Sequence, residues 1–148
     1  MTVADQSTPE RSARAAPRLL VALASLGVFL AVFLPFLDRG TGIWVYYSAS
    51  VLGPLTVGVL GVLVLLVVGA GPLTSMSPAT LAGVALGGSV AMVIVAAFWA
   101  LSVRHEVVLS LSRLDLFAYH RWILLGLTLV ALAGAVWYAV AARGRSTA

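Results

Sequence analysis

The run ATLAGVALGGSVAMVIVAAFWAL, residues 79–101, decides the fold class of this chain. It contains no Asp, Glu, Lys, Arg or His, and Ser77 and Pro78 precede it as a helix N-cap and a first-turn proline. At about 1.5 Å per residue the run can cross about 30 Å of hydrocarbon. It also lacks the polar face that a helix of a water-soluble bundle needs. The sequence therefore predicts a transmembrane helix.

Three further uncharged runs have the same character, at about 19–37, 50–69 and 122–142. The chain is 61% hydrophobic and 9% charged, a composition that a water-soluble domain of 148 residues could not bury. We therefore predict an all-α membrane protein, a four-transmembrane-helix bundle over residues 18–142. Residues 1–17 are expected to be a disordered polar tail, and residues 143–148 a short basic tail. A cleaved signal peptide is disfavoured, because the first run is too long and lacks a cleavage site.

Several function classes are excluded or disfavoured by what the chain lacks. It has no cysteine, which excludes disulfides, thiol redox relays and thiolate metal sites. Its Arg residues are scattered and form no basic stripe, so no nucleic-acid partner is expected. The four runs contain no ionisable residue, which a coupled transporter or pump normally needs. We expect no cofactor and no catalysis within the bilayer.

Small residues recur every four positions in two of the runs. Gly83, Gly87 and Ala91 form one series, and Ala131, Ala135 and Ala139 form another. Such series let helix backbones approach closely in lipid. Two interpretations stay open at this point: the series pack the third and fourth helices within one bundle, or they join two copies of the chain.

Aromatic residues gather near the first and third connections, which we expect to form a cap on one face of the bundle. Residues 43–47 and 109–116 could pair as short strands, or form an amphipathic segment in the headgroup plane. The same cap holds the polar candidates outside the tails: Asp38, Arg39, Arg104, His105, Glu106, Arg113, Asp115, His120 and Arg121. Metal or anion binding by His105, Glu106, Asp115 and His120 is one hypothesis. Surface ion pairs and contacts with lipid headgroups are the simpler one.

Short stretches of the chain resemble small four-helix membrane proteins of halophilic archaea, a group with no assigned activity. The stretches are Phe33–Leu37, Trp44–Ser48, Gly53–Leu55, His120–Trp122 and Trp137–Tyr138. The resemblance would cover most of the chain from the first run onward. It implies a four-helix fold and an archaeal cell membrane, and it implies no mechanism.

The sequence favours a non-enzymatic accessory or structural membrane protein that binds lipid or another membrane protein. A small oligomeric channel or transporter lined by Gly, Ser and Thr is one alternative. An enzyme that acts on a lipid headgroup at the cap is the other. Three Arg residues precede the first run and one follows it, which favours cytoplasmic N- and C-termini.

Overall fold

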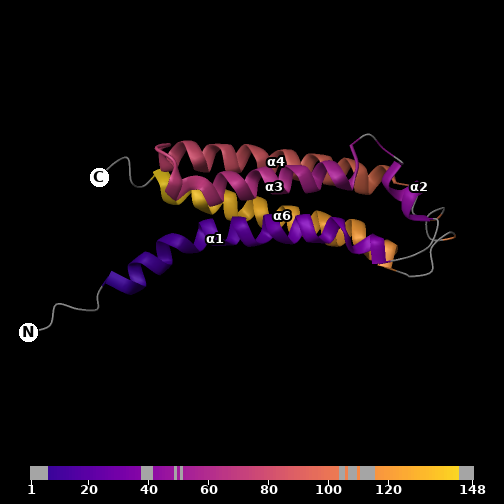
Figure 1. Cartoon of the computed structure of the whole chain (residues 1–148), viewed down its shortest axis with the longest axis horizontal. Helices are drawn as coiled ribbons and strands as arrows, with labels where there is room; N and C mark the ends of the chain where they lie inside the picture. Colours follow the sequence, from indigo (N-terminus) through magenta and orange to yellow (C-terminus); the bar gives the residue numbers. More distant parts are fainter. Residues whose placement is uncertain are drawn as a thin grey trace, which may run out of the picture.

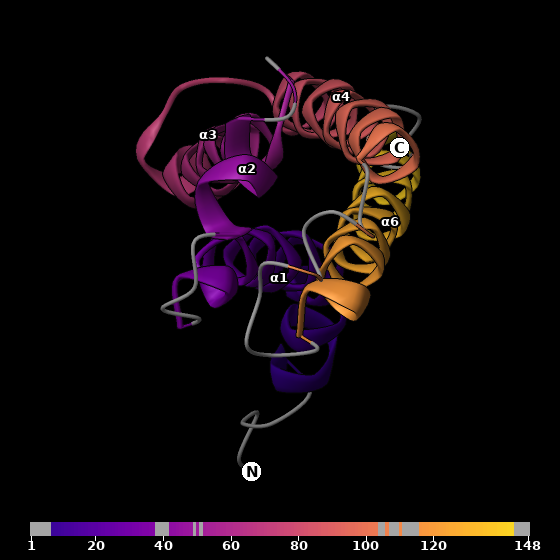
Figure 2. The same ribbon diagram turned by 90° about the vertical axis from the view of Figure 1, so that its right-hand side faces the viewer.

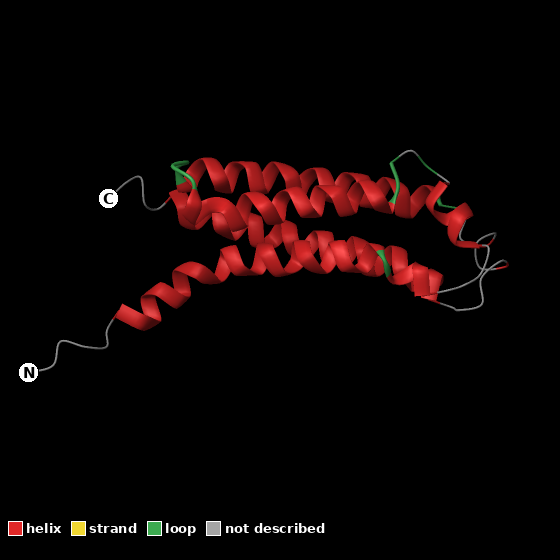
Figure 3. Ribbon diagram, viewed as in Figure 1, coloured by secondary structure: helices red, strands yellow, loops and turns green. Residues whose placement is uncertain are grey.

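The computed structural model describes residues 7–37, 42–48, 50, 52–103, 106, 110 and 116–143. The long helices are α1 (Ser7–Val32), α3 (Pro54–Ala70), α4 (Pro78–Ser102) and α6 (Leu116–Arg143). Shorter pieces are α2 (Gly42–Ser48) and the 3₁₀ helices η1 (Leu34–Leu37) and η2 (Gly71–Leu73). This part of the chain is all-helical and contains no strand (Figure 3).

The four long helices pack side by side in a ring. α1 contacts α3 and α6, and α4 contacts the same two helices from the other side (Figure 2). Helices that follow one another in the chain run in opposite directions, so the start of α1 and the end of α6 lie at one end (Figure 1). We call this the terminal end. α2 lies at the opposite end, which we call the α2 end.

The surface of the bundle is rich in large apolar side chains, and many of its buried residues are small. Ala85, Ala131 and Ala135 are fully buried, while large hydrophobic side chains such as Leu66 and Ile94 are exposed. Three helical segments are long and apolar enough to cross a membrane: Ala15–Leu37, Pro78–Ser102 and Ala118–Arg143. These features suggest a membrane-embedded protein.

α3 is shorter than the run at 50–69 led us to expect. It begins at Pro54 and has 17 residues, the lower limit for a helix that crosses a bilayer. Gly53 precedes it in an extended conformation, and the proline occupies the first turn, where its missing N–H has no consequence.

α1 begins earlier than expected, because residues 7–17 are helical where we expected a disordered tail. Ser7 and Glu10 have the spacing of a capping box, and Pro9 stands in the first turn, where proline is tolerated. The residues that follow are mostly Ala and Arg, which are good helix formers. The N-terminal turns of α1 bend away from the other helices (Figure 1).

The small residues divide between the interior and the outer surface. Ala131 and Ala135 lie inside, and Ala139 packs against the core, in line with packing within one bundle. Gly83 and Gly87 differ, because both are exposed and a Cβ added to either would meet no atom within 4 Å.

Glycines outside that series bring the helices together. A Cβ on Gly88 of α4 would lie 2.5 Å from a methyl group of Val64 on α3. A Cβ on Gly61 of α3 would lie 3.2 Å from the Ser25 carbonyl of α1. Ala91, the last member of the α4 series, is half-buried.

The first connection contains a helix, so the strand prediction for residues 43–47 is wrong. Ile43, Tyr46 and Tyr47 have the i, i+3, i+4 spacing of one helix face, and they turn toward the bundle. Trp44, on the other side of α2, is 75% exposed. The second stretch, 109–116, lies almost entirely outside the described residues.

Candidate functional site at the ends of the helices

The candidate site at the α2 end begins with a proline that leaves a helix unfinished. In α1, the carbonyl of Ala31 would accept a hydrogen bond from the N–H of residue 35, but residue 35 is a proline and has none. The N–H of Phe36 bonds to Phe33, at 3.0 Å, rather than to Val32. Both carbonyls therefore need donors from elsewhere, since an unpaired carbonyl inside a membrane costs several kcal/mol.

Side chains far along the chain supply both donors. Nε2 of His120, on α6, lies 2.8 Å from the Ala31 carbonyl oxygen. The hydroxyl of Tyr47, on α2, donates to the Val32 carbonyl. The last turn of α1 is thus completed by residues that follow it by 89 and 15 positions.

The tautomer of His120 follows from its two partners. A carbonyl oxygen can only accept, so Nε2 of His120 carries a hydrogen. Nδ1 lies 2.7 Å from the Tyr46 hydroxyl. Burial, followed by the neighbouring Tyr47, raises the pKa of Tyr46 far above its ordinary value of 10.0, so the hydroxyl keeps its proton and donates it to Nδ1. Both imidazole nitrogens are therefore engaged within the protein.

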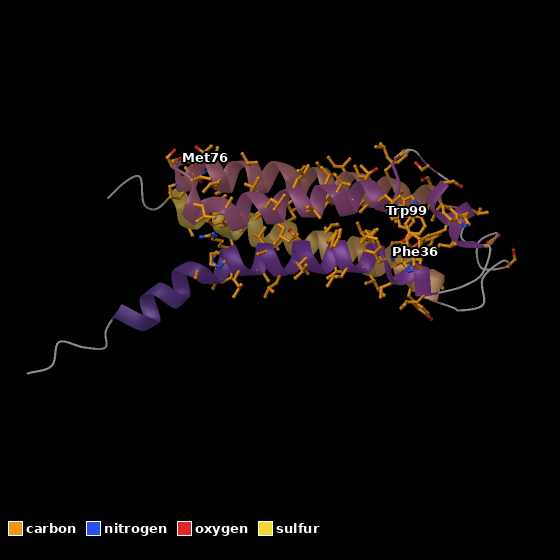
Figure 4. All side chains as sticks on the ribbon, viewed as in Figure 1. Phe36, Met76 and Trp99 are labelled. Carbon is orange, nitrogen blue, oxygen red and sulfur yellow. The ribbon has the colours of Figure 1, made fainter. Side chains whose placement is uncertain are left out.

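Aromatic rings enclose this hydrogen-bonded pair. The ring centroids of Tyr46 and Trp99 lie 5.0 Å apart at 83°, and those of Trp99 and His120 lie 6.1 Å apart at 78°. All three side chains are fully buried. We call Tyr46, Trp99 and His120 the buried cluster. Figure 4 shows Trp99 and Phe36 toward the α2 end and Met76 at the terminal end.

The indole N–H of Trp99 is buried and has no hydrogen-bond partner among the described residues. In the middle of the bundle, the hydroxyls of Ser25 and Ser89 are in the same situation. Thr128 is also fully buried, but its hydroxyl donates to the Leu125 carbonyl of its own helix at 2.8 Å. The hydroxyl-bearing Ser25, Ser89 and Thr128 are therefore buried in the interior, whereas Gly83 and Gly87 face outward.

A second unfinished helix lies at the terminal end. In α3, the carbonyl of Val68 would accept from residue 72, which is again a proline. Arg18 of α1 takes that place: its Nε donates to the Val68 carbonyl at 2.9 Å and its Nη2 to the Gly69 carbonyl at 3.3 Å. A cation at the C-terminus of a helix is also favoured by the helix dipole.

The C-terminus of α4, at the α2 end, also receives a donor from a side chain of another helix. Nη1 of Arg121, on α6, donates to the Ala100 carbonyl at 3.4 Å, and the guanidinium lies 5.0 Å from the ring centre of Trp122. The C-termini of α1, α3 and α4 thus each receive donors from a basic or imidazole side chain of another helix. Two residues of the predicted polar cap, His120 and Arg121, serve in this way.

Of the other predicted cap residues the structure describes only Glu106, which is exposed. Asp38, Arg39, Arg104, His105, Arg113 and Asp115 lie outside the described residues. The metal and anion hypothesis stays a prediction for them, but His120 has no free ring nitrogen with which to bind a metal. Among the described residues, no group of three His, Asp or Glu side chains could hold an ion.

Sequence reasoning missed three parts of this site: the Tyr46 hydroxyl that bonds to His120, the α1 carbonyls that accept from His120 and Tyr47, and the role of Arg18. Prolines 35 and 72 were the available signals, because each removes a known donor from a helix end. The partners were not readable, since Arg18 and His120 lie 50 and 89 residues from the carbonyls they bind.

The comparisons with known proteins identify a family and no activity. Residues 11–143 match the model of a family of unknown function (DUF7548), and the chain belongs to that family. No curated protein and no solved structure matches the chain.

Proposed function

We propose that this member of the family is a four-span integral membrane protein with a non-enzymatic role, an accessory or structural component that binds another membrane protein or lipid. α3 is added as a span to the three longer segments. It is short, but it is free of charge and packed between two longer helices. A helix of 17 residues can cross where the bilayer is thin or the flanking residues reach the interface. The resemblance to proteins of halophilic archaea supports an archaeal cell membrane as the location.

One observation carries the non-enzymatic part of this proposal. The imidazole of His120 and the guanidinium groups of Arg18 and Arg121 are used to complete helix ends, and His120 is fully buried. A general base or a nucleophile must reach a substrate, and the His120 imidazole has no free nitrogen to do so. The exposed surface of the long helices is instead apolar, which suits contact with lipid tails or with another membrane helix.

The orientation with both termini in the cytoplasm belongs to the same proposal. The N-terminal flank supports it, with three arginines before the first span and one after it. In this orientation α2 and the predicted cap face outward.

The test is co-purification of the tagged protein from its own cell in mild detergent, with mass spectrometry of retained proteins and lipids. We expect the protein to stay in the membrane fraction after a carbonate wash and to retain one partner near a one-to-one ratio, or a defined lipid. Turnover of a substrate or solute flux by the protein reconstituted alone would contradict the accessory role. Loss of the protein from washed membranes would contradict membrane insertion.

A further inference from the structure

We propose that Arg18 and the recess beside it bind an anionic lipid at the terminal end of the bundle, with the lipid phosphate on the guanidinium and one hydrocarbon chain against α1 and α3. This inference rests on the proposed membrane insertion and names the lipid class. The recess has a volume of about 290 Å³ and is lined by Ala15, Arg18, Leu19, Ala22, Val68 and Gly69. One charged side chain thus borders an otherwise apolar recess.

The charge of Arg18 has no carboxylate partner among the described side chains. Its two hydrogen bonds, through Nε and Nη2, go to neutral main-chain carbonyls of α3. Glu106, the one carboxylate whose side chain is described, follows α4 in the chain and belongs to the opposite end. A guanidinium has five N–H donors in a planar fork, so Arg18 keeps donors for a phosphate while it holds α3.

The position of Arg18 matches the depth of lipid headgroups. The uncharged run 19–37 begins directly after Arg18, so in the proposed insertion Arg18 lies at the edge of the membrane-spanning part of α1. Leu19, the next residue, is 56% exposed. In the proposed orientation this end faces the cytoplasmic leaflet, which carries the anionic lipids. A phosphate on Arg18 would place the lipid chain along Leu19, Ala22 and Val68.

The two carbonyl bonds also fix the guanidinium. An exposed arginine must lose side-chain freedom to hold a phosphate, whereas Arg18 is already ordered by α3. Arg18 combines this ordering with a position beside an apolar recess, and we assign the site to it for that reason.

The experiment is native mass spectrometry of the protein in detergent micelles with added phosphatidylglycerol or, separately, phosphatidylcholine. Both lipids carry a phosphate, but in phosphatidylcholine the choline cation offsets its charge. We therefore expect retention of phosphatidylglycerol to exceed that of phosphatidylcholine by about fivefold, the effect of about one arginine on a net negative headgroup. Arg18→Gln should remove this preference. Arg143→Gln, which deletes the same charge at the same end of the bundle, should keep it.

A second variant keeps the test valid if Arg18→Gln fails to fold. Ala15→Phe fills the recess from an exposed position and leaves the carbonyl bonds of Arg18 intact, and Ala133→Phe, at an exposed position on α6, is its control. We expect only Ala15→Phe to lower retention of phosphatidylglycerol. Equal retention by the two phenylalanine variants, or equal retention of the two lipids by the unmodified protein, would overturn the lipid site.

Competition with inorganic phosphate tests whether the site binds a lipid or a free anion. Phosphate at the same concentration as the lipid should not displace phosphatidylglycerol, because it lacks the hydrocarbon chain. Displacement would overturn the proposed lipid site. None of these results bears on membrane insertion, so the lipid site and the proposed function can fail separately.

Discussion

The hydrogen bond between His120 and α1 predicts a measurable coupling between His120 and Pro35. His120→Leu takes the imidazole donor from the buried Ala31 carbonyl, at about 1–3 kcal/mol, and takes the Nδ1 acceptor from the Tyr46 hydroxyl. We therefore expect the free energy of unfolding to fall by at least about 1–3 kcal/mol. In a Pro35→Ala background the new alanine supplies an N–H in the same turn. The carbonyl then has a donor without His120, and the cost of His120→Leu should shrink by about 1–2 kcal/mol.

The assay is reversible unfolding in mixed detergent micelles, followed by circular dichroism, on the two single variants, the double variant and the unmodified protein. The double-mutant cycle gives the coupling energy directly. The control cycle pairs His120→Leu with Pro72→Ala, which lies at the opposite end of the bundle and should be additive. Additivity within about 0.3–0.5 kcal/mol for Pro35 and His120 would refute the reasoning, because the imidazole would then not replace the missing amide.

Three further predictions follow from other parts of the structure. Gly87→Ala should stabilise the protein by about 0.5–1 kcal/mol, because alanine has the higher helix propensity and Gly87 faces outward. Gly88→Ala should destabilise it by about 1–3 kcal/mol, because the new Cβ would crowd Val64. Thermal unfolding measures both changes, and equal effects would contradict the assigned faces. Burial raises the pKa of Tyr46 and of Tyr47, so the folded state holds two protons that the unfolded state releases above pH 10.0. The free energy of unfolding should fall above that pH by about 1.4 kcal/mol per unit for each tyrosine, and denaturant titrations that show no fall would count against the burial. The chain has no cysteine, so a single introduced cysteine can be labelled selectively. In the proposed orientation an impermeant thiol reagent should react with Ser75→Cys only from the cytoplasmic side and with Trp44→Cys only from the outside. Labelling of both from one side would contradict the topology.

Much of the fold is readable from uncharged stretches of sequence alone. The run at 79–101 differs from α4, Pro78–Ser102, by one residue at each end. Its limits were visible because Ser77 caps the helix, accepting from the Thr80 N–H at 3.1 Å. α2 was less readable, because five of its seven residues are aromatic or β-branched, and so short a segment satisfies the patterns of a strand and of a helix turn.

The sequence did not show which face of each helix packs inward, or which side chains bond to the carbonyls of the site. Only the structure shows both. In a helix that is apolar all round, no polar side marks which residues face lipid, so Gly83 and Gly87 could not be distinguished from Gly88 by their spacing. The position of His120 in the sequence indicated an interfacial residue. Its burial arises because the end of α1 lacks a donor, and that need is met only when α6 packs against α1. The candidate site is therefore a property of the assembled helices.

The completion of α1 by His120 has a consequence for biosynthesis. The histidine that supplies a donor to the Ala31 carbonyl is synthesised 89 residues after it. A nascent chain that has not yet made α6, or a variant truncated before it, therefore lacks this donor. The last turn of the first helix is completed only when α6 packs against it.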